Sequence, residues 1–122
     1  MSEILNNLVI SVHGNPTVDF PKIDIPIQDY DTVTIKHLSY AGVTAETIFM
    51  LWCTYTNSYV TSFMTDAKFN YDNSLDTIIR LNKSNFEMSF KLFFYDPADS
   101  IFKPCPDVAV LSITLEFTKY TK

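Results

Sequence analysis

Two stretches of this chain alternate between large apolar and polar residues with a period of two. In residues 111–117, the apolar positions are Leu111, Ile113, Leu115 and Phe117. In residues 86–95 they are Phe86, Met88, Phe90, Leu92 and Phe94. This period is typical of half-buried β-strands. Phe93 and Tyr95 also make the second side of residues 86–95 apolar, which predicts that something covers that side too, either this chain or another molecule.

Shorter patterns predict further strands. Residues 8–12 alternate and are followed by a turn sequence at 13–16. Ile23, Ile25 and Ile27 share one side of an extended segment, and its prolines confine it to a sheet edge. Residues 48–56 are continuously apolar at first, as in a central strand, and the two polar residues 57–58 predict a tight hairpin to a strand at 59–64. A short strand at 75–81 completes the set.

In residues 33–40 the apolar phase slips by one position. Val33 and Ile35 share one phase, whereas Leu38 and Tyr40 share the other. Because a one-residue slip moves side chains to the opposite face, we predict a β-bulge near Lys36 and His37.

The remaining segments are predicted to be turns and loops. Residues 43–46 are expected to form a short helical turn, and residues 66–74 and 82–85 a polar loop and a turn. Residues 96–107 contain three prolines and are expected to form a loop without a strand ladder. Since prolines lower the entropy cost of presenting side chains, Ile101 and Phe102 in this loop are the candidate partner-contact residues.

About eight strands separated by turns indicate an all-β fold, an antiparallel β-sandwich of jelly-roll-like type. An immunoglobulin-like sandwich has similar strand content and remains open. With 122 residues, the chain is expected to form a single domain spanning 1–122.

The charge and composition of the chain argue against nucleic acids and membranes as partners. The formal net charge is −5 and the basic residues are scattered, so direct nucleic-acid binding is not expected. No apolar run reaches the roughly 18 residues of a membrane span, and the N-terminal residues lack the pattern of a secretion signal. We therefore expect no membrane partner and synthesis in the cytoplasm, where Cys53 and Cys105 would be free thiols.

No motif indicates catalysis, and we expect no enzyme, no cofactor and no metal site. The only candidate nucleophiles with a base are Cys53 or a serine, paired with His13 or His37. Cys53 falls in the most hydrophobic strand, where it is expected to be structural. The cysteines and histidines lack zinc-ligand spacing. Two groups of carboxylates are expected to be solvated turn residues instead of calcium ligands: Asp96 with Asp99, and Asp66, Asp72 and Asp76.

Aromatic residues offer one more class of site. Trp52, Tyr55 and Tyr59 could line a sugar-binding platform, although a core position is the expected one for Trp52. This pattern keeps a carbohydrate- or receptor-binding module as the alternative function.

Three stretches together carry a family resemblance: DFPKIDIPIQDYDTVTIKHLSYAG at 19–42, FEMSFKLFFYDP at 86–97 and LSITLEFTKY at 111–120. They resemble small virion proteins of virophages, polinton-like viruses and related large DNA viruses. In such proteins a Val-x-Ile-x-x-Leu-Ser-Tyr strand, a strand ending in Phe-Tyr-Asp and a final Leu-x-Leu-x-Phe strand recur. The resemblance implies a single jelly roll that acts in the virion as a minor capsid, penton-like or cement component, in contact with other capsid proteins or with itself as a homo-oligomer.

Overall fold

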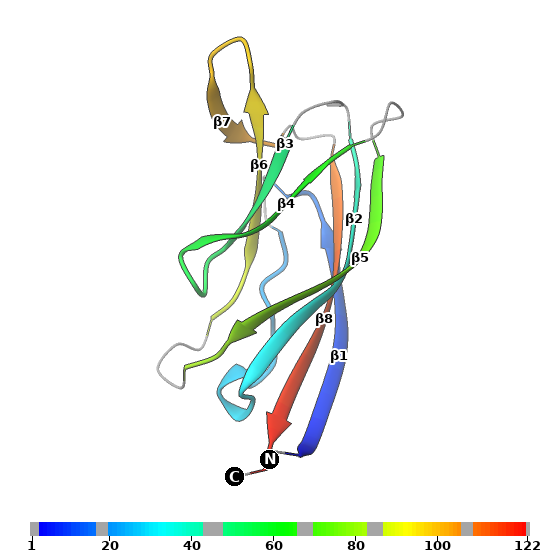
Figure 1. The fold of residues 1–122 in the computed structure, drawn as a ribbon, viewed down its shortest axis with the longest axis vertical. Coiled ribbons are helices and arrows are strands. Elements are labelled where there is room, and N and C mark those ends of the chain that lie inside the picture. Colours follow the sequence, from blue (N-terminus) through cyan, green and yellow to red (C-terminus); the bar gives the residue numbers. More distant parts are fainter. Residues whose placement is uncertain are drawn as a thin grey trace.

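The computed structural model describes residues 3–16, 20–42, 48–65, 70–82, 87–105 and 109–121. These residues form the predicted antiparallel β-sandwich, with eight strands in two four-stranded sheets (Figure 1). The strands are β1 (Ile4–Gly14), β2 (Thr32–Ala41), β3 (Ile48–Cys53), β4 (Ser58–Met64), β5 (Asn70–Arg80), β6 (Phe90–Asp96), β7 (Ile101–Pro104) and β8 (Val110–Tyr120). One turn of 3₁₀ helix, Ile27–Asp29, precedes β2.

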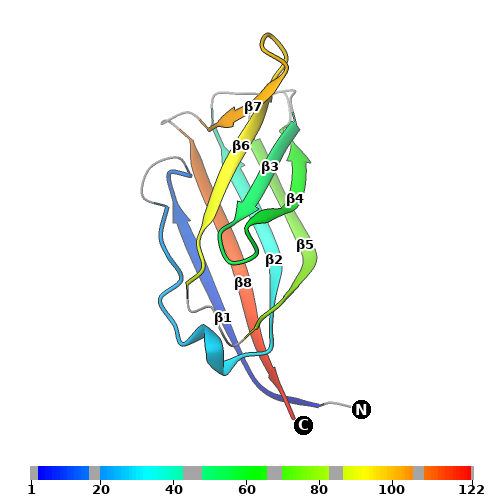
Figure 2. The ribbon, with the colours of Figure 1, turned by 90° about the vertical axis from the view of Figure 1, so that its left-hand side faces the viewer.

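The two sheets differ in the strands that form their edges. Sheet A has the order β1-β8-β2-β5, and sheet B has the order β4-β3-β6-β7. Figure 2 shows sheet B lying across sheet A. The hairpin of β6 and β7 projects beyond the body of the sandwich at one end, and both chain termini lie at the other end (Figure 1).

The core lies between the two sheets, and the alternation predicted its members correctly in residues 33–40, 88–92 and 111–117. Its fully buried side chains come from the central strands of both sheets: Val33, Ile35, Leu38, Phe49, Leu51, Phe90, Leu92, Leu111, Ile113, Leu115 and Phe117. Aromatic rings join the two sheets, since the ring centroid of Tyr40 in β2 lies 4.7 Å from that of Phe49 in β3. Each large apolar side chain buried in this way contributes roughly 1.5–3 kcal/mol.

The predicted bulge is confirmed. The register of β2 shifts between Ile35 and His37 against both of its neighbours, β5 and β8. The extra residue lets Ile35 and Leu38 both point inward, and both are completely buried. The slip in the apolar pattern is thus the local signature of a strand that keeps one face in the core.

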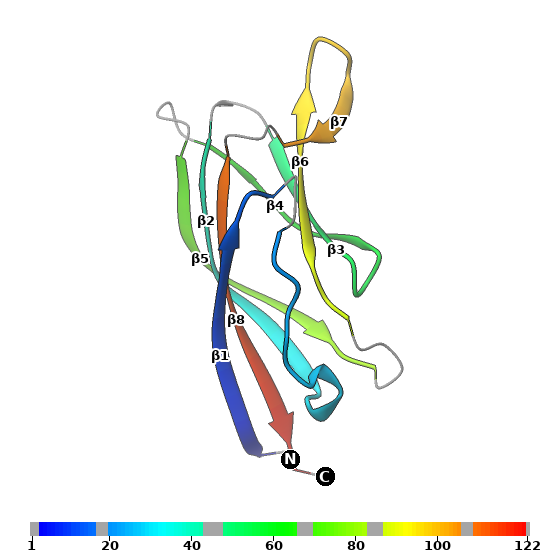
Figure 3. The ribbon, with the colours of Figure 1, turned by 180° about the vertical axis from the view of Figure 1, so that it is seen from behind.

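Residues 20–26 are extended and lie beside β6 (Figure 3), but they form no regular strand. Phe20, Ile23 and Ile27 are buried, and the backbone N–H of Ile23 donates to the carbonyl of Met88 at 2.9 Å. Ile23 and Ile27 thus face the core on the expected side, but the segment adds no strand to the sheet edge, since Pro21 and Pro26 have no N–H with which to continue a ladder.

Two loop predictions are wrong. Residues 96–107 were expected to hold no ladder, yet β7 pairs with residues 93–96 of β6. A short edge strand tolerates Pro104 because that residue needs no ladder hydrogen bond on its open side. Residues 70–74 were expected in a loop but form the start of β5, where they pair with the second half of β2.

Smaller differences concern boundaries. The connection between β3 and β4 is the turn 54–57, longer than the predicted two residues, with Asn57 at a φ of 53°. The strand predicted at 86–95 begins at Phe90, although Met88 before it is fully buried in the predicted phase. The helical turn expected at 43–46, the first part of the loop at 66–69, and residues 83–86 lie outside the described residues.

Candidate functional site

Five aromatic side chains gather on the outer side of sheet B, and we call this set the aromatic face: Trp52, Tyr59, Phe93, Tyr95 and Phe102. Trp52, Phe93 and Tyr95 alternate with the buried residues of β3 and β6, so strand geometry points them away from the core. Cross-strand pairing completes the set, because Trp52 lies opposite Tyr59 of β4 and Tyr95 lies opposite Phe102 of β7.

The rings of the aromatic face contact one another in a chain across four strands. Tyr59 packs edge-to-face on Trp52 at a centroid distance of 5.0 Å and on Phe93 at 5.9 Å. Phe102 lies 6.2 Å from Tyr59 and 5.4 Å from Tyr95. These are favourable geometries for ring pairs, so the face is ordered before any partner arrives.

The aromatic face is open to solvent. Tyr59 and Phe102 expose 40% and 39% of their surface, and the apolar residues Ile48 and Met64 at its border are exposed as well. In the strands of sheet B the charged residues are Lys91, Asp96 and Lys103. Asp96 and Lys103 form an ion pair with each other, so the surface around the rings carries little net charge.

The two predicted partner-contact residues separate in the structure. Phe102 belongs to the aromatic face, whereas Ile101, 53% exposed, is the preceding residue of β7 and points to the opposite side of the projecting hairpin. The structure therefore places Phe102 in a larger apolar surface and leaves Ile101 outside it.

Ionic contacts stiffen this hairpin. The Lys103 ammonium group donates to the carboxylates of both Asp96 and Asp99, and the Asp96 carboxylate also accepts from the backbone N–H of Ala98 at 3.0 Å. Hydrogen bonding to Lys103 lowers the pKa of Asp96 below its usual value, and the two carboxylates raise the pKa of Lys103 to about 12. The two carboxylates that the sequence offered as possible calcium ligands, Asp96 and Asp99, are therefore neutralised by the ammonium group of Lys103.

The structure divides the three residues of the predicted sugar platform. Trp52 was expected in the core, but it lies half-buried on the outer side of sheet B. Tyr55 is buried, and its hydroxyl donates to the carbonyl of Asn82 at 2.5 Å and accepts from the N–H of Asn82 at 2.6 Å. Of these three residues, only Trp52 and Tyr59 lie on the aromatic face.

The structure does not assemble the possible nucleophile pair. Cys53 is fully buried on the inner side of sheet B. His37 lies on the outer side of sheet A, where its ring contacts the carboxylate of Asp72.

Asp76 pairs with Lys36, and within the described residues no three metal-ligating side chains come together. Cys105 is also a buried free thiol, 3.8 Å from the Tyr40 hydroxyl.

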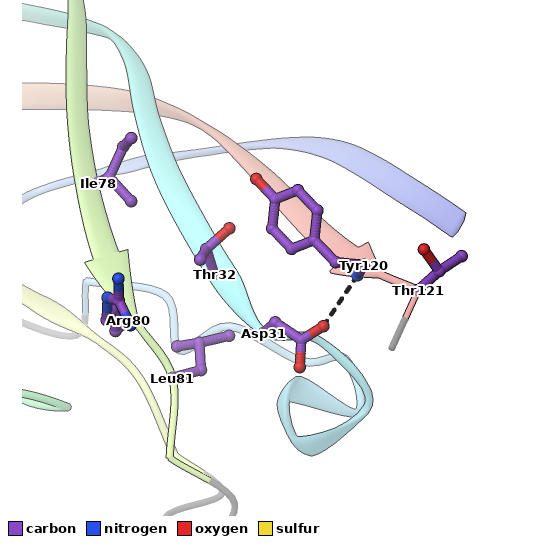
Figure 4. A pocket seen from close by; sticks show the side chains of 7 residues that line it. All are labelled: Asp31, Thr32, Ile78, Arg80, Leu81, Tyr120 and Thr121. Atoms are coloured by element: carbon purple, nitrogen blue, oxygen red, sulfur yellow. Dashed lines mark hydrogen bonds between the residues drawn. The ribbon is translucent and has the colours of Figure 1, made fainter. Parts of the chain in front are cut away.

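An open hollow of about 650 Å³ lies at the end of the sandwich near the termini (Figure 4). It is lined by Asp31, Thr32, Ile78, Arg80, Leu81, Tyr120 and Thr121. The Asp31 carboxylate accepts from the backbone N–H of Tyr120 at 2.8 Å, which ties the start of β2 to the end of β8. These residues are far apart in the sequence, so the local pattern did not predict the hollow.

A scan against models of known protein families finds no match, and a search of curated protein sequences also finds none. No helix in the described part of the chain has the length and apolar character needed to cross a bilayer.

Proposed function

We propose that this chain is a structural virion protein, a minor capsid or capsid-associated jelly-roll component that self-assembles or binds other capsid subunits. The observation that carries the proposal is the aromatic face, an ordered and exposed apolar surface on a rigid sandwich. Surfaces of this kind mark protein contact sites because covering the rings removes apolar area from water. The virion is the proposed location, after synthesis in the host cytoplasm.

The path of the chain supports the jelly-roll part of the proposal. If residues 20–26 are counted as the strand beside β6, successive segments pass from sheet A to sheet B and back in the order of two Greek keys. The final order is then β1-β8-β2-β5 facing β4-β3-β6 and residues 20–26. Jelly rolls of two Greek keys occur in viral capsid and lectin domains, and the resemblance of residues 19–42, 86–97 and 111–120 to virion proteins favours the capsid role.

The distribution of charge supports the aromatic face as the contact surface. The chain has a net charge of −5, so copies of it repel each other at long range. Glu116, Asp72 and Asp76 belong to strands of sheet A, whereas the only carboxylate in the strands of sheet B is the paired Asp96. A subunit therefore meets less repulsion when it approaches the outer side of sheet B.

Substitution of Phe102 tests this proposal. Phe102→Asp should abolish assembly through the aromatic face and leave the fold intact, because the carboxylate would have to be desolvated in the contact while the residue is exposed in the free subunit. Ile78→Asp is the matched control, since Ile78 is an exposed apolar residue on the outer side of sheet A. Light scattering across a concentration series measures the mass, and an unchanged oligomer in Phe102→Asp would contradict the choice of contact surface.

A second candidate function is a carbohydrate- or receptor-binding module, and the position of Trp52 favours it. An indole and the phenol of Tyr59 that share one exposed surface can stack on apolar faces of a sugar ring. Glycan-array screening of the wild type and of Trp52→Ala tests this alternative. A strictly monomeric wild type with Trp52-dependent glycan binding would favour it over the capsid role.

A further inference from the structure

From Asn6 onward, the free edge of β1 lacks the features that normally prevent edge strands from pairing. One side of β1 pairs with β8 over most of its length, and no backbone hydrogen bond of the described residues involves its other side between Ile4 and His13. The 11-residue sequence ILNNLVISVHG contains no proline and no lysine, arginine, aspartate or glutamate. Its only irregularity is a register shift between Ile4 and Asn6. Long, flat, uncharged edge strands are templates for pairing with another strand.

The other edge strands of the sandwich are protected. β5 carries two aspartates and an arginine, and β7 has only four residues and ends in Pro104. β4 is shorter than β1, and a register shift interrupts the middle of its ladder with β3. Charge, proline, shortness and bulges are the usual means of protecting an edge. β1 is therefore the least protected of the four edge strands.

The inward side of β1 is also incompletely covered. Leu8, Ile10 and Val12 point toward the core but are only partly buried. Their direct partners in β8, Phe117, Leu115 and Ile113, are fully buried. The edge strand thus leaves apolar surface that another strand beside β1 would remove from water.

We propose that β1 pairs antiparallel with β1 of a second copy of this chain, which joins two sheets A into one eight-stranded sheet across a two-fold axis. The strand suits itself as a partner, since it contains no aspartate, glutamate, lysine or arginine that would face a like charge in the second copy. A pairing centred on Val9 sets Leu8 against Ile10 of the second copy on the core side and Asn7 against Ser11 on the outer side. This pairing keeps each side chain on its own face of the sheet.

The length of β1 is sufficient for a specific contact. An antiparallel ladder provides on average about one backbone hydrogen bond per residue pair, so the regular residues 6–12 of a pairing centred on Val9 give about seven hydrogen bonds, within the range of roughly 5–15 of a typical protein interface. The interface is distinct from the aromatic face, because β1 lies in sheet A and the aromatic rings lie on sheet B. The inference therefore goes beyond the proposed function and does not depend on it.

Val9→Lys tests the pairing, with Ile78→Lys as its matched control. Val9 and Ile78 are 57% and 64% exposed, and they lie at opposite edges of one cross-strand row that runs through Glu116 and Thr34. Both changes add a lysine to the outer side of sheet A, but only the first adds it to the pairing edge. Making both in the Phe102→Asp background separates this contact from the aromatic face.

In that background the protein should remain a dimer at high concentration. Val9→Lys should raise the dimer dissociation constant about tenfold or more, because like charges then face each other across the axis, while Ile78→Lys should change it less than about twofold, since its edge makes no contact. Sedimentation velocity measures both constants, and hydrogen exchange should show protection that increases with concentration in β1 and not in β5. A background protein that is monomeric at every concentration, or equal weakening by the two lysines, would overturn the proposal.

Discussion

Replacement of Phe90 by alanine tests the phase of the strand around which the core is built. Phe90 is the first residue of β6, lies opposite Cys53 of β3 and is fully buried on the inner side of sheet B. Alanine at this position removes the whole ring and leaves a cavity between the two sheets. The neighbouring core residues come from fixed strands, so they can fill the space only in part.

The expected loss can be estimated from the buried area. An aromatic side chain buries roughly 150–250 Å², and at about 25 cal/mol per Å² this corresponds to about 4–6 kcal/mol for the complete side chain. Alanine retains part of this area, and buried Phe→Ala changes cost about 3–5 kcal/mol. Because domains are stable by only about 5–15 kcal/mol, Phe90→Ala should remove a large share of the free energy of unfolding.

Urea unfolding followed by fluorescence of Trp52, the single tryptophan, measures this loss. Phe93→Ala is the matched control, since Phe93 lies on the same strand but in the aromatic face, and its replacement should cost about 1 kcal/mol. The midpoint should fall with an unchanged slope if the unfolded state is unaffected. A loss below about 1 kcal/mol for Phe90→Ala, or equal losses in the two variants, would refute the assigned phase.

Two further predictions concern buried polar groups. Tyr55→Phe removes the hydroxyl that bonds both backbone groups of Asn82 and should lower the free energy of unfolding by about 1–3 kcal/mol. Tyr59→Phe, on the exposed aromatic face, should leave it unchanged in the same urea experiment. Equal effects of the two changes would contradict the stabilising role of the Tyr55 hydroxyl. Burial raises the pKa of Cys105 from 9.0 to about 11. The unfolded thiol therefore ionises first, and stability should fall as the pH rises from about 9 to about 11. Urea midpoints across this range should fall less in Cys105→Ala, and an identical fall would count against this cause.

The candidate site was predictable only in part. The sequence identified Phe102 as exposed and noted that Phe93 and Tyr95 made a second apolar side of one strand. It did not indicate that these residues meet Trp52 and Tyr59, because that contact requires the pairing of β3 with β6 and of β6 with β7. The signal available was the excess of outward aromatics in two separate strands, and strand neighbours cannot be read from one sequence.

The sequence by itself determined most of the strands, the inward phase of those that alternate, and the bulge in β2. Alternation is a local property, since successive side chains of a strand point to opposite sides whatever the strand pairs with. The clean phase of Leu111, Ile113, Leu115 and Phe117 therefore predicted four fully buried residues, and the slip between Ile35 and Leu38 predicted the bulge.

Only the tertiary structure decided which strands lie at edges and which apolar outer surfaces stay uncovered. Pro104 is compatible with β7 because that strand is the last of sheet B, and the polar residues 70–74 extend β5 because β2 offers them a partner. Trp52 lies outside the core because the inner side of β3 is filled by Phe49, Leu51 and Cys53. The outcomes for β7 and for residues 70–74 depend on neighbours distant in sequence, and the periodicity of a single segment carries no information about its neighbours.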